Sequence, residues 1–184
     1  MIEIISGTNR PGSNTLKVAK HLLELYQAKG VEAGIIDLTE LPAGVFTPEA
    51  YAEKPAEFSP FCDRILKADG LHVVTPEYNG SFPGVLKLYI DMMKFPESFE
   101  NRCVCFTGVA AGAWGGLRPV EHLQQVFGYR NAQICPNRVF VNLVHTKLDA
   151  DGTPKEDFLK QLFEKQVADF YLFVERNKGL TASA

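Results

Sequence analysis

Apolar residues recur along the chain in two alternating patterns. Short continuous runs of apolar residues predict buried strands, whereas apolar residues three or four positions apart predict amphipathic helices. Five runs fit strands, at residues 2–6, 31–38, 70–78, 102–110 and 132–144. Helical spacing follows each of these runs in turn, at residues 16–30, 61–68, 84–95, 115–128 and 154–177. The chain therefore alternates strands with helices along almost its whole length.

This alternation indicates an α/β fold. Strands that are apolar on both faces are typical of a parallel sheet that helices cover on both sides. Right-handed crossovers then leave the doubly wound topologies as the main candidates. We expect one domain over residues 1–184, with Pro136 at an edge or irregularity of the sheet and the residues after about 177 loose. The loop at residues 39–57 is too short to separate two domains.

Composition supports one domain with a substantial core and narrows its partners. The 184 residues are 46% hydrophobic and 22% charged, which is typical of a globular chain. The formal net charge of −3, without a block of like charges, disfavours nucleic acid and anionic membranes as partners. No basic leader precedes the first strand and no apolar run reaches about eighteen residues, so we expect a cytoplasmic protein.

The four cysteines carry no chemistry in this interpretation. Two of them lie two positions apart in an apolar run, which places them on the same side of a strand, and no second pair has zinc-finger spacing. We expect buried free thiols at Cys62, Cys103, Cys105 and Cys135.

The loops after the first, third and fourth strands are the candidate ligand site, because ligands of such sheets bind beyond the carboxyl ends of the strands. The first loop, SGTNRPGSNT at residues 6–15, has glycines at P-loop spacing but lacks the lysine of that motif. Its polar groups and the Arg10 guanidinium surround the expected amino end of a helix, where unpaired N–H groups favour an anion. This loop predicts a phosphate monoester site, with the alternative that Ser13 only caps the helix.

The second loop, TPEYNGSFPG at residues 75–84, suits a flat ligand. Two prolines stiffen it, its glycines allow close approach, and Tyr78 offers an aromatic face with a polar tip. The third loop, TGVAAGAWGG at residues 107–116, offers an unhindered backbone wall. Taken alone, each loop also fits a purely structural connection.

Together the loops resemble the NADPH-dependent FMN reductases of flavodoxin-like fold, which include chromate, azo-dye and quinone reductases. The family's phosphate loop, G-[ST]-x-R-x-x-S, is matched by residues 7–13, and its P-E-Y-N segment by residues 76–79. The following GSFPGVLKLYID also resembles the family pattern, although Leu88 stands where Asn is usual. Thr15 stands where the phosphate loop often has Asn, and its hydroxyl can still donate a hydrogen bond.

The resemblance implies the function. FMN would take hydride at N5 from NADPH or NADH, and a small acceptor such as a quinone, azo compound, chromate or free flavin would then take it over the same ring. The flavin performs the redox step, so we expect no catalytic side chain and no metal. Backbone N–H groups of residues 78–81 are suited to stabilise charge on the reduced ring. The residues expected to bind the cofactor are Thr8, Arg10, Ser13, Asn14, Thr15, Pro76, Glu77, Tyr78, Asn79, Gly80, Ser81, Gly108 and Ala110.

Two other function classes remain as alternatives. A flavodoxin-type electron carrier would share the fold and FMN without NAD(P)H turnover, but would usually be more acidic than a net charge of −3. A nucleotide-binding regulatory module would show no flavin absorption. The four histidines are expected to be surface or packing residues: His21, His72, His122 and His145.

The helix at residues 84–95 also predicts assembly. It is apolar over more of its circumference than one sheet-facing stripe requires, so part of it needs another cover. We expect a homodimer, or a homotetramer, with the flavin near the subunit contact. The alternative is a helix that is deeply buried within one subunit. If Met92 or Met93 is interfacial, its replacement by Lys should separate the subunits.

Overall fold

The fold is a five-stranded parallel sheet with helices on both faces. A computed structural model of the protein describes residues 1–181. The sheet order is β2-β1-β3-β4-β5 and every neighbouring pair is parallel. This is the flavodoxin-type doubly wound order, which confirms the expected fold class. The strands are β1 (Ile2–Ser6), β2 (Ala33–Asp37), β3 (Gly70–Pro76), β4 (Cys103–Val109) and β5 (Gln133–Val141).

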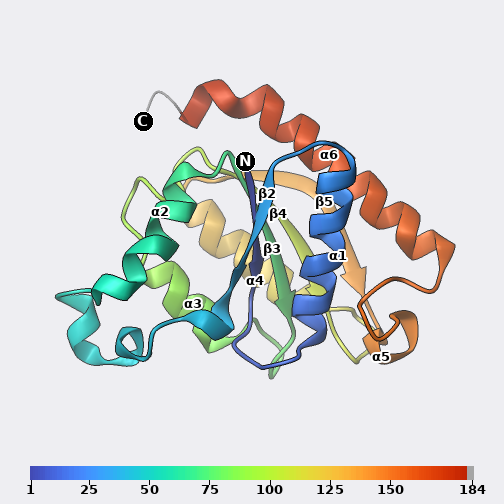
Figure 1. Cartoon of the computed structure of the whole chain (residues 1–184), viewed down its shortest axis with the longest axis horizontal. Coiled ribbons are helices and arrows are strands. Elements are labelled where there is room, and N and C mark those ends of the chain that lie inside the picture. Colours follow the sequence, from blue (N-terminus) through green and yellow to red (C-terminus); the bar gives the residue numbers. More distant parts are fainter. Residues whose placement is uncertain (182–184) are drawn as a thin grey trace.

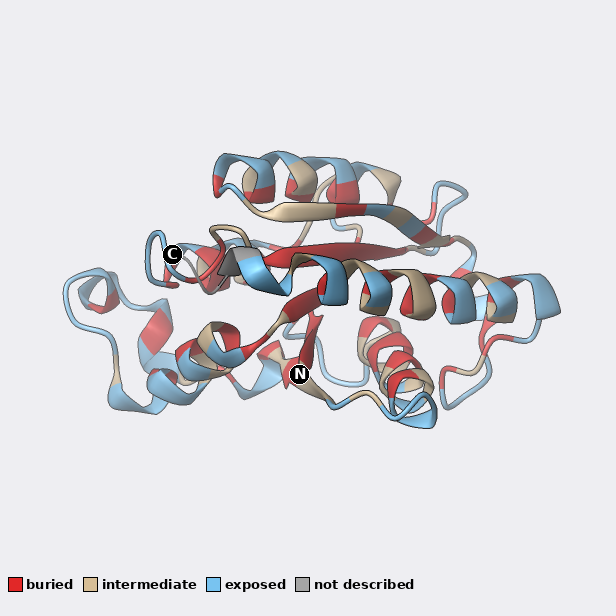
Figure 2. Ribbon diagram, turned by 90° about the horizontal axis from the view of Figure 1, so that it is seen from above, coloured by how far each residue is buried: buried red, intermediate tan, exposed pale blue. Residues whose placement is uncertain are grey.

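Helices cover both faces of the sheet and build one apolar core on each (Figure 1). α1 and α6 share one core, whereas α2, α3 and α4 share the other. Figure 2 shows the consequence, with buried residues along the strands and on the inward sides of the helices. The helices are α1 (Asn14–Ala28), α2 (Ser59–Lys67), α3 (Gly84–Asp91), α4 (Leu117–Tyr129), α5 (Val144–Lys147) and α6 (Asp157–Thr181).

The loop expected at residues 39–57 is not structureless. It contains short 3-10 helices whose apolar residues join the core beneath α2 and α3, as Val45, Ala50 and Phe58 do. These helices are η1 (Leu38–Glu40), η2 (Ala43–Phe46), η3 (Pro48–Tyr51) and η4 (Ala56–Phe58).

β5 is an edge strand with an irregularity, as Pro136 predicted. Val104 of β4 pairs with Ile134, but Phe106 pairs with Arg138, so the register shifts around Pro136. The strand was expected to continue to Val144, and it ends at Val141 instead. α5 begins at Val144, after a turn that brings the chain back over the sheet edge.

α3 is shorter than expected and more deeply buried. It ends at Asp91 rather than at residue 95, and Met92 caps it. Met92 and Met93 are only 1% and 4% exposed, and both belong to the core. Their burial corrects the expectation that one of them lies at a subunit contact. Leu88 also packs against this core.

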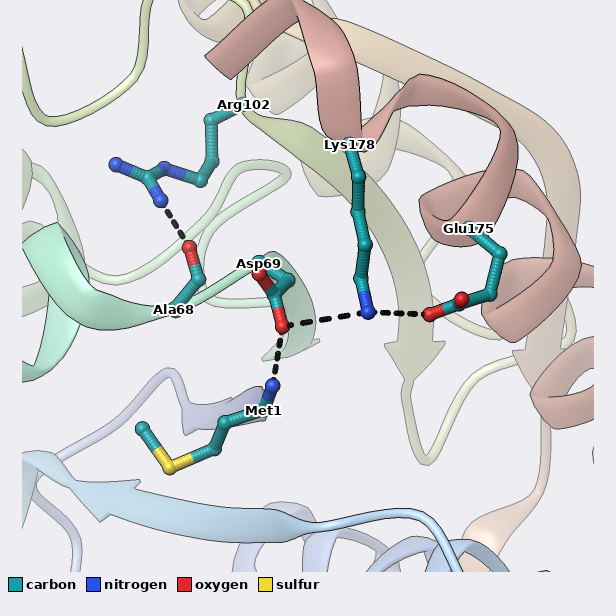
Figure 3. Close-up of polar contacts among 6 residues, drawn as sticks. All are labelled: Met1, Ala68, Asp69, Arg102, Glu175 and Lys178. Carbon is teal, nitrogen blue, oxygen red and sulfur yellow. Dashed lines mark hydrogen bonds and ion pairs between the residues drawn. The ribbon is translucent and has the colours of Figure 1, made fainter. Parts of the chain in front are cut away.

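α6 ends later than expected, at Thr181, and residues 182–184 lie outside the described residues. Figure 3 shows the contacts that hold its last turns to the amino edge of the sheet. Lys178 Nζ lies 2.6 Å from Glu175 Oε1 and 3.9 Å from Asp69 Oδ2, and Asp69 also pairs with the Met1 amino group. These ion pairs join the first residue after Asn177 to Asp69, which precedes β3.

A chain of hydrogen bonds crosses the sheet beneath α1 and α6. Thr107 Oγ1 donates to Gln166 Oε1 over 2.8 Å, so Thr107 accepts from His72 Nε2, which is also 2.8 Å away. His72 Nδ1 then accepts from the Tyr26 hydroxyl over 2.9 Å. His72 is fully buried, and burial lowers its pKa from 6.5 to about 3. The histidine is therefore a neutral packing residue, as the sequence predicted.

The cysteines match their prediction. All four are buried and unpaired, and Cys103 and Cys105 lie in the same core as Cys135. Burial raises the pKa of each thiol, so none is activated as a thiolate. Among residues 1–181, no helix is long and apolar enough to cross a membrane.

Candidate functional site

A cleft of about 490 Å³ lies at the carboxyl edge of the sheet. Figure 1 shows the loops after β1 and β3 side by side at the lower edge of the view, with α5 at the same edge. The cleft volume lies in the range of small-molecule sites. Its walls come from all three predicted loops, which the fold brings together. Eight of the predicted residues line it: Arg10, Ser13, Asn14, Thr15, Pro76, Glu77, Tyr78 and Ala110.

One end of the cleft is built from donors. Ser13 caps α1, since its Oγ accepts from the Leu16 N–H over 3.1 Å. The N–H groups of residues 12–15 meet no acceptor within the described part of the chain. Arg10 is exposed and has no ion-pair partner among residues 1–181. Unpaired N–H groups, a cationic side chain and the positive end of a helix dipole are groups that attract an anion.

The other end is a tight turn after β3. The Tyr78 N–H donates to the Ser81 carbonyl over 2.8 Å, and the Ser81 N–H donates back over 3.0 Å. Asn79 and Gly80 between them have φ of 51° and 78°, the left-handed pair of a type I′ turn. The turn corrects one expectation, because Tyr78 and Ser81 use their N–H groups internally. Only Asn79 and Gly80 have N–H groups without an acceptor within the 78–81 turn.

Side chains fix this turn from two directions. The Tyr78 hydroxyl lies 2.9 Å from Thr8 Oγ1, which joins the second loop to the first. Arg118 of α4 donates to Glu77 Oε1 over 2.7 Å, and His122, one helical turn later, lies 2.8 Å from Ser81 Oγ. α4 therefore holds the turn against the sheet.

Gly108 lies outside the cleft and serves close packing. A Cβ there would lie 2.6 Å from the Gly115 carbonyl oxygen and 2.8 Å from that of Gly116. The missing side chain lets the third loop fold back over β4, so that Ala110 and Ala111 reach the cleft. Five predicted residues do not line the cleft: Thr8, Asn79, Gly80, Ser81 and Gly108.

Acidic groups are scarce around the cleft. Glu77 is the one carboxylate among the described residues that line it, and Arg118 pairs with it. No cluster of three or more His, Cys, Asp and Glu side chains is placed to hold a metal ion within residues 1–181. The cleft therefore offers net positive charge to a ligand.

The sequence profile of the NADPH-dependent FMN reductases matches residues 1–146. The chain belongs to this family. It is 28% identical to an NAD(P)H-dependent FMN reductase of Pseudomonas aeruginosa, over 95% of each chain. It is 30% identical to a quinone reductase of Escherichia coli, over 78% of each chain. The solved structure of the NAD(P)H:acceptor oxidoreductase FerB from Paracoccus denitrificans has the same fold, with a TM-score of 0.82 at 20% identity over 96% of this chain and 97% of that chain.

The FMN reductase also has cleft residues that the sequence did not predict. Val144 and His145 line the cleft, and Arg118 and His122 hold the turn after β3. Arg118 and His122 are four positions apart, and this spacing predicts that both side chains lie on the same face of a helix. His145 gave no such signal, because the strand was expected to run on to residue 144.

Proposed function

We propose that this FMN reductase binds FMN in the cleft and passes reducing equivalents from NADPH or NADH to a small acceptor such as a quinone. One observation supports this proposal most directly. A single cleft of about 490 Å³ contains both the unpaired donors of the first loop and the turn that carries Tyr78. The quinone reductase of Escherichia coli, one of the relatives, supports the acceptor class. The FMN-binding residues that we propose are the eight predicted residues that line the cleft.

The donors of the cleft fit a phosphate monoester. Free N–H groups of residues 12–15 point to an anion, and Arg10 supplies a fixed positive charge. The hydroxyls of Ser13 and Thr15 add two neutral donors. The paired carboxylate of Glu77 belongs to the second loop, so the phosphate loop presents no acidic side chain to a phosphate.

The turn after β3 fits a flat ring. Pro76 and Tyr78 line the cleft there, and Tyr78 is 36% exposed, so its ring is accessible. Bound FMN supplies the hydride chemistry. The protein contributes orientation, and the Asn79 and Gly80 N–H groups, which have no acceptor within the turn, are the proposed donors to an electron-rich ring edge.

The flavodoxin-type carrier is the less favoured alternative. The family profile and both relatives named above are those of reductases that use NAD(P)H or reduce quinones. We also infer a cytoplasmic location, because four unpaired thiols suit a reducing compartment.

The cofactor released from the purified protein should be FMN and not FAD. The first loop ends in an anion site for one phosphate, and the chain has no G-x-G-x-x-G to hold a pyrophosphate. Denaturation followed by chromatography of the released chromophore tests this. A predominance of FAD would contradict the assignment of the first loop.

We further propose that the chain forms a homodimer through a groove between α3 and α4. The groove has a volume of about 490 Å³, and its rim carries Phe95 and Tyr129, which are 66% and 80% exposed. Arg130 lies against the Phe95 ring, with its guanidinium carbon 4.9 Å from the ring centre. The groove is lined by the later residues of α3 and α4, whereas the contacts of α4 with the turn after β3 come from its first turns.

Tyr129→Asp should convert the dimer to a monomer, because burial of an unpaired carboxylate at an interface is costly. Tyr129 is exposed, so the change should leave the fold of one subunit intact. Light scattering measures the mass, and Phe158→Asp, at a 69% exposed aromatic on α6, is the matched control. An unmodified protein that is monomeric at micromolar concentration would rule out the dimer.

A further inference from the structure

We propose that His145 is a phosphate-binding residue of the cleft, which donates from Nε2 to a phosphate oxygen of FMN. The inference rests on the proposed function. It adds to the phosphate loop a donor from a distant part of the chain, since His145 belongs to α5. It also replaces the expectation that this histidine is only a surface or packing residue.

The contact with Asn14 fixes the orientation of the imidazole. Asn14 is the first residue of α1, and its Nδ2 lies 3.4 Å from His145 Nδ1. An amide nitrogen can only donate, so Nδ1 accepts and the proton of the neutral ring lies on Nε2. Within residues 1–181, Nε2 has no hydrogen-bond partner and His145 has no ion-pair partner. Since His145 lines the cleft, a ligand can supply the acceptor.

The backbone before His145 is held in a costly conformation. Leu143 has φ of 46°, a left-handed conformation that branched or bulky residues rarely adopt. Two hydrogen bonds maintain it, from the Leu143 N–H to the Gly112 carbonyl at 3.3 Å and from the Val144 N–H to the Ala110 carbonyl at 3.1 Å. Strained residues that the surroundings over-determine occur mainly at binding sites. Here the turn places residues 144 and 145 in the cleft wall.

The position of His145 in the cleft indicates which part of FMN it would contact. Its contact residue, Asn14, lies among the free N–H groups of residues 12–15, at the anion end of the cleft. The first loop lacks the lysine of a P-loop and has Arg10 as its one cationic side chain. A second side-chain donor across the cleft would enclose the phosphate between two elements. The phosphate of FMN, rather than its ring, is therefore the expected partner.

His145→Ala should weaken FMN binding about tenfold or more and change riboflavin binding less than twofold. The dissociation constants are measured by quenching of flavin fluorescence on the full-length apoprotein. Lys147→Ala is the matched control, because it removes another basic side chain of α5. Lys147 Nζ lies 3.4 Å from Glu156 Oε2, and Lys147 does not line the cleft. His145→Gln should recover part of the affinity, because its amide can donate a hydrogen bond.

Nitrogen NMR of the His145 ring gives a readout independent of affinity. The Nε2 resonance of the wild-type protein should shift on addition of FMN and stay in place with riboflavin. Equal losses for FMN and riboflavin in His145→Ala, or an unchanged ratio of the two, would overturn the inference. If FMN affinity depends on Arg10 but not on His145, the proposed function stands and only this assignment falls. If the unmodified chain binds no flavin, both fall.

Discussion

Arg10→Ala should raise the dissociation constant of FMN by about 10- to 150-fold. The change removes a charge-assisted hydrogen bond to the phosphate, which contributes about 1.5–3 kcal/mol. Arg10 has no ion-pair partner among residues 1–181, so its loss leaves no buried charge behind and the fold should be unaffected. Fluorescence quenching on the apoprotein measures the change.

Riboflavin separates the phosphate contact from other effects of the substitution. It carries the same ring without the phosphate, so its affinity for Arg10→Ala should match that of the wild type. Arg10→Lys should retain part of the FMN affinity, because an ammonium keeps the charge but loses the bidentate geometry of a guanidinium. An equal loss for both flavins would place Arg10 away from the phosphate.

Acid should destabilise the protein through His72, by about 1.4 kcal/mol for each pH unit below 6.5. Burial lowers the pKa of His72 from 6.5 to about 3, so between these values the unfolded chain binds a proton that the folded chain does not. Stability is therefore complete above pH 6.5 and falls as the pH falls toward 3, by about 4–5 kcal/mol in all. Denaturant unfolding at pH 7.5, 7, 6.5, 6 and 5.5 measures the trend while nearly all carboxylates stay ionised.

His72→Asn isolates this contribution. The variant should be less stable at pH 7, because it breaks the hydrogen bonds to Tyr26 and Thr107, but its stability should vary less with pH. Burial also lowers the pKa of His21, so part of the wild-type slope should remain in the variant. NMR titration of the His72 ring in the wild type gives a second test. A ring that titrates near pH 6.5 in the folded protein would contradict the account.

The sequence predicted the fold and the three loops because their signals are local. Alternating apolar runs and helical spacing define β1 to β4 and their helices without reference to distant residues. The carboxyl edge of a parallel sheet then places the three loops together, whatever their separation in the chain. Arg10, Ser13, Asn14 and Thr15 could therefore be assigned to one site before the structure.

The parts that the sequence did not predict depend on contacts between distant segments. The chain turns at Leu143, where the Leu143 and Val144 N–H groups donate to carbonyls of the loop at residues 110–112, whereas apolar patterning continued the strand to Val144. Without that turn, the sequence could not predict that His145 lines the cleft. The close approach of Gly115 to Gly108 is likewise a contact between segments that the local pattern does not show.

The apolar surface of α3 likewise depends on contacts with distant segments, which affects the prediction of a dimer. Its apolar circumference is mostly covered within one subunit, because the 3-10 helices at residues 38–58 and α4 share its core. The surface that remains open is the groove beside Phe95 and Tyr129, and α4 supplies part of it. The sequence pattern of one helix cannot show whether its apolar residues pack within the subunit or against a second subunit.

Anaerobic addition of NADPH to the purified protein tests the central claim most directly. We predict that the protein carries the visible absorption of FMN, that NADPH bleaches it without any other protein, and that a quinone restores it. A purified protein that binds no flavin when FMN is supplied, or whose bound flavin neither NADPH nor NADH bleaches, would contradict the account.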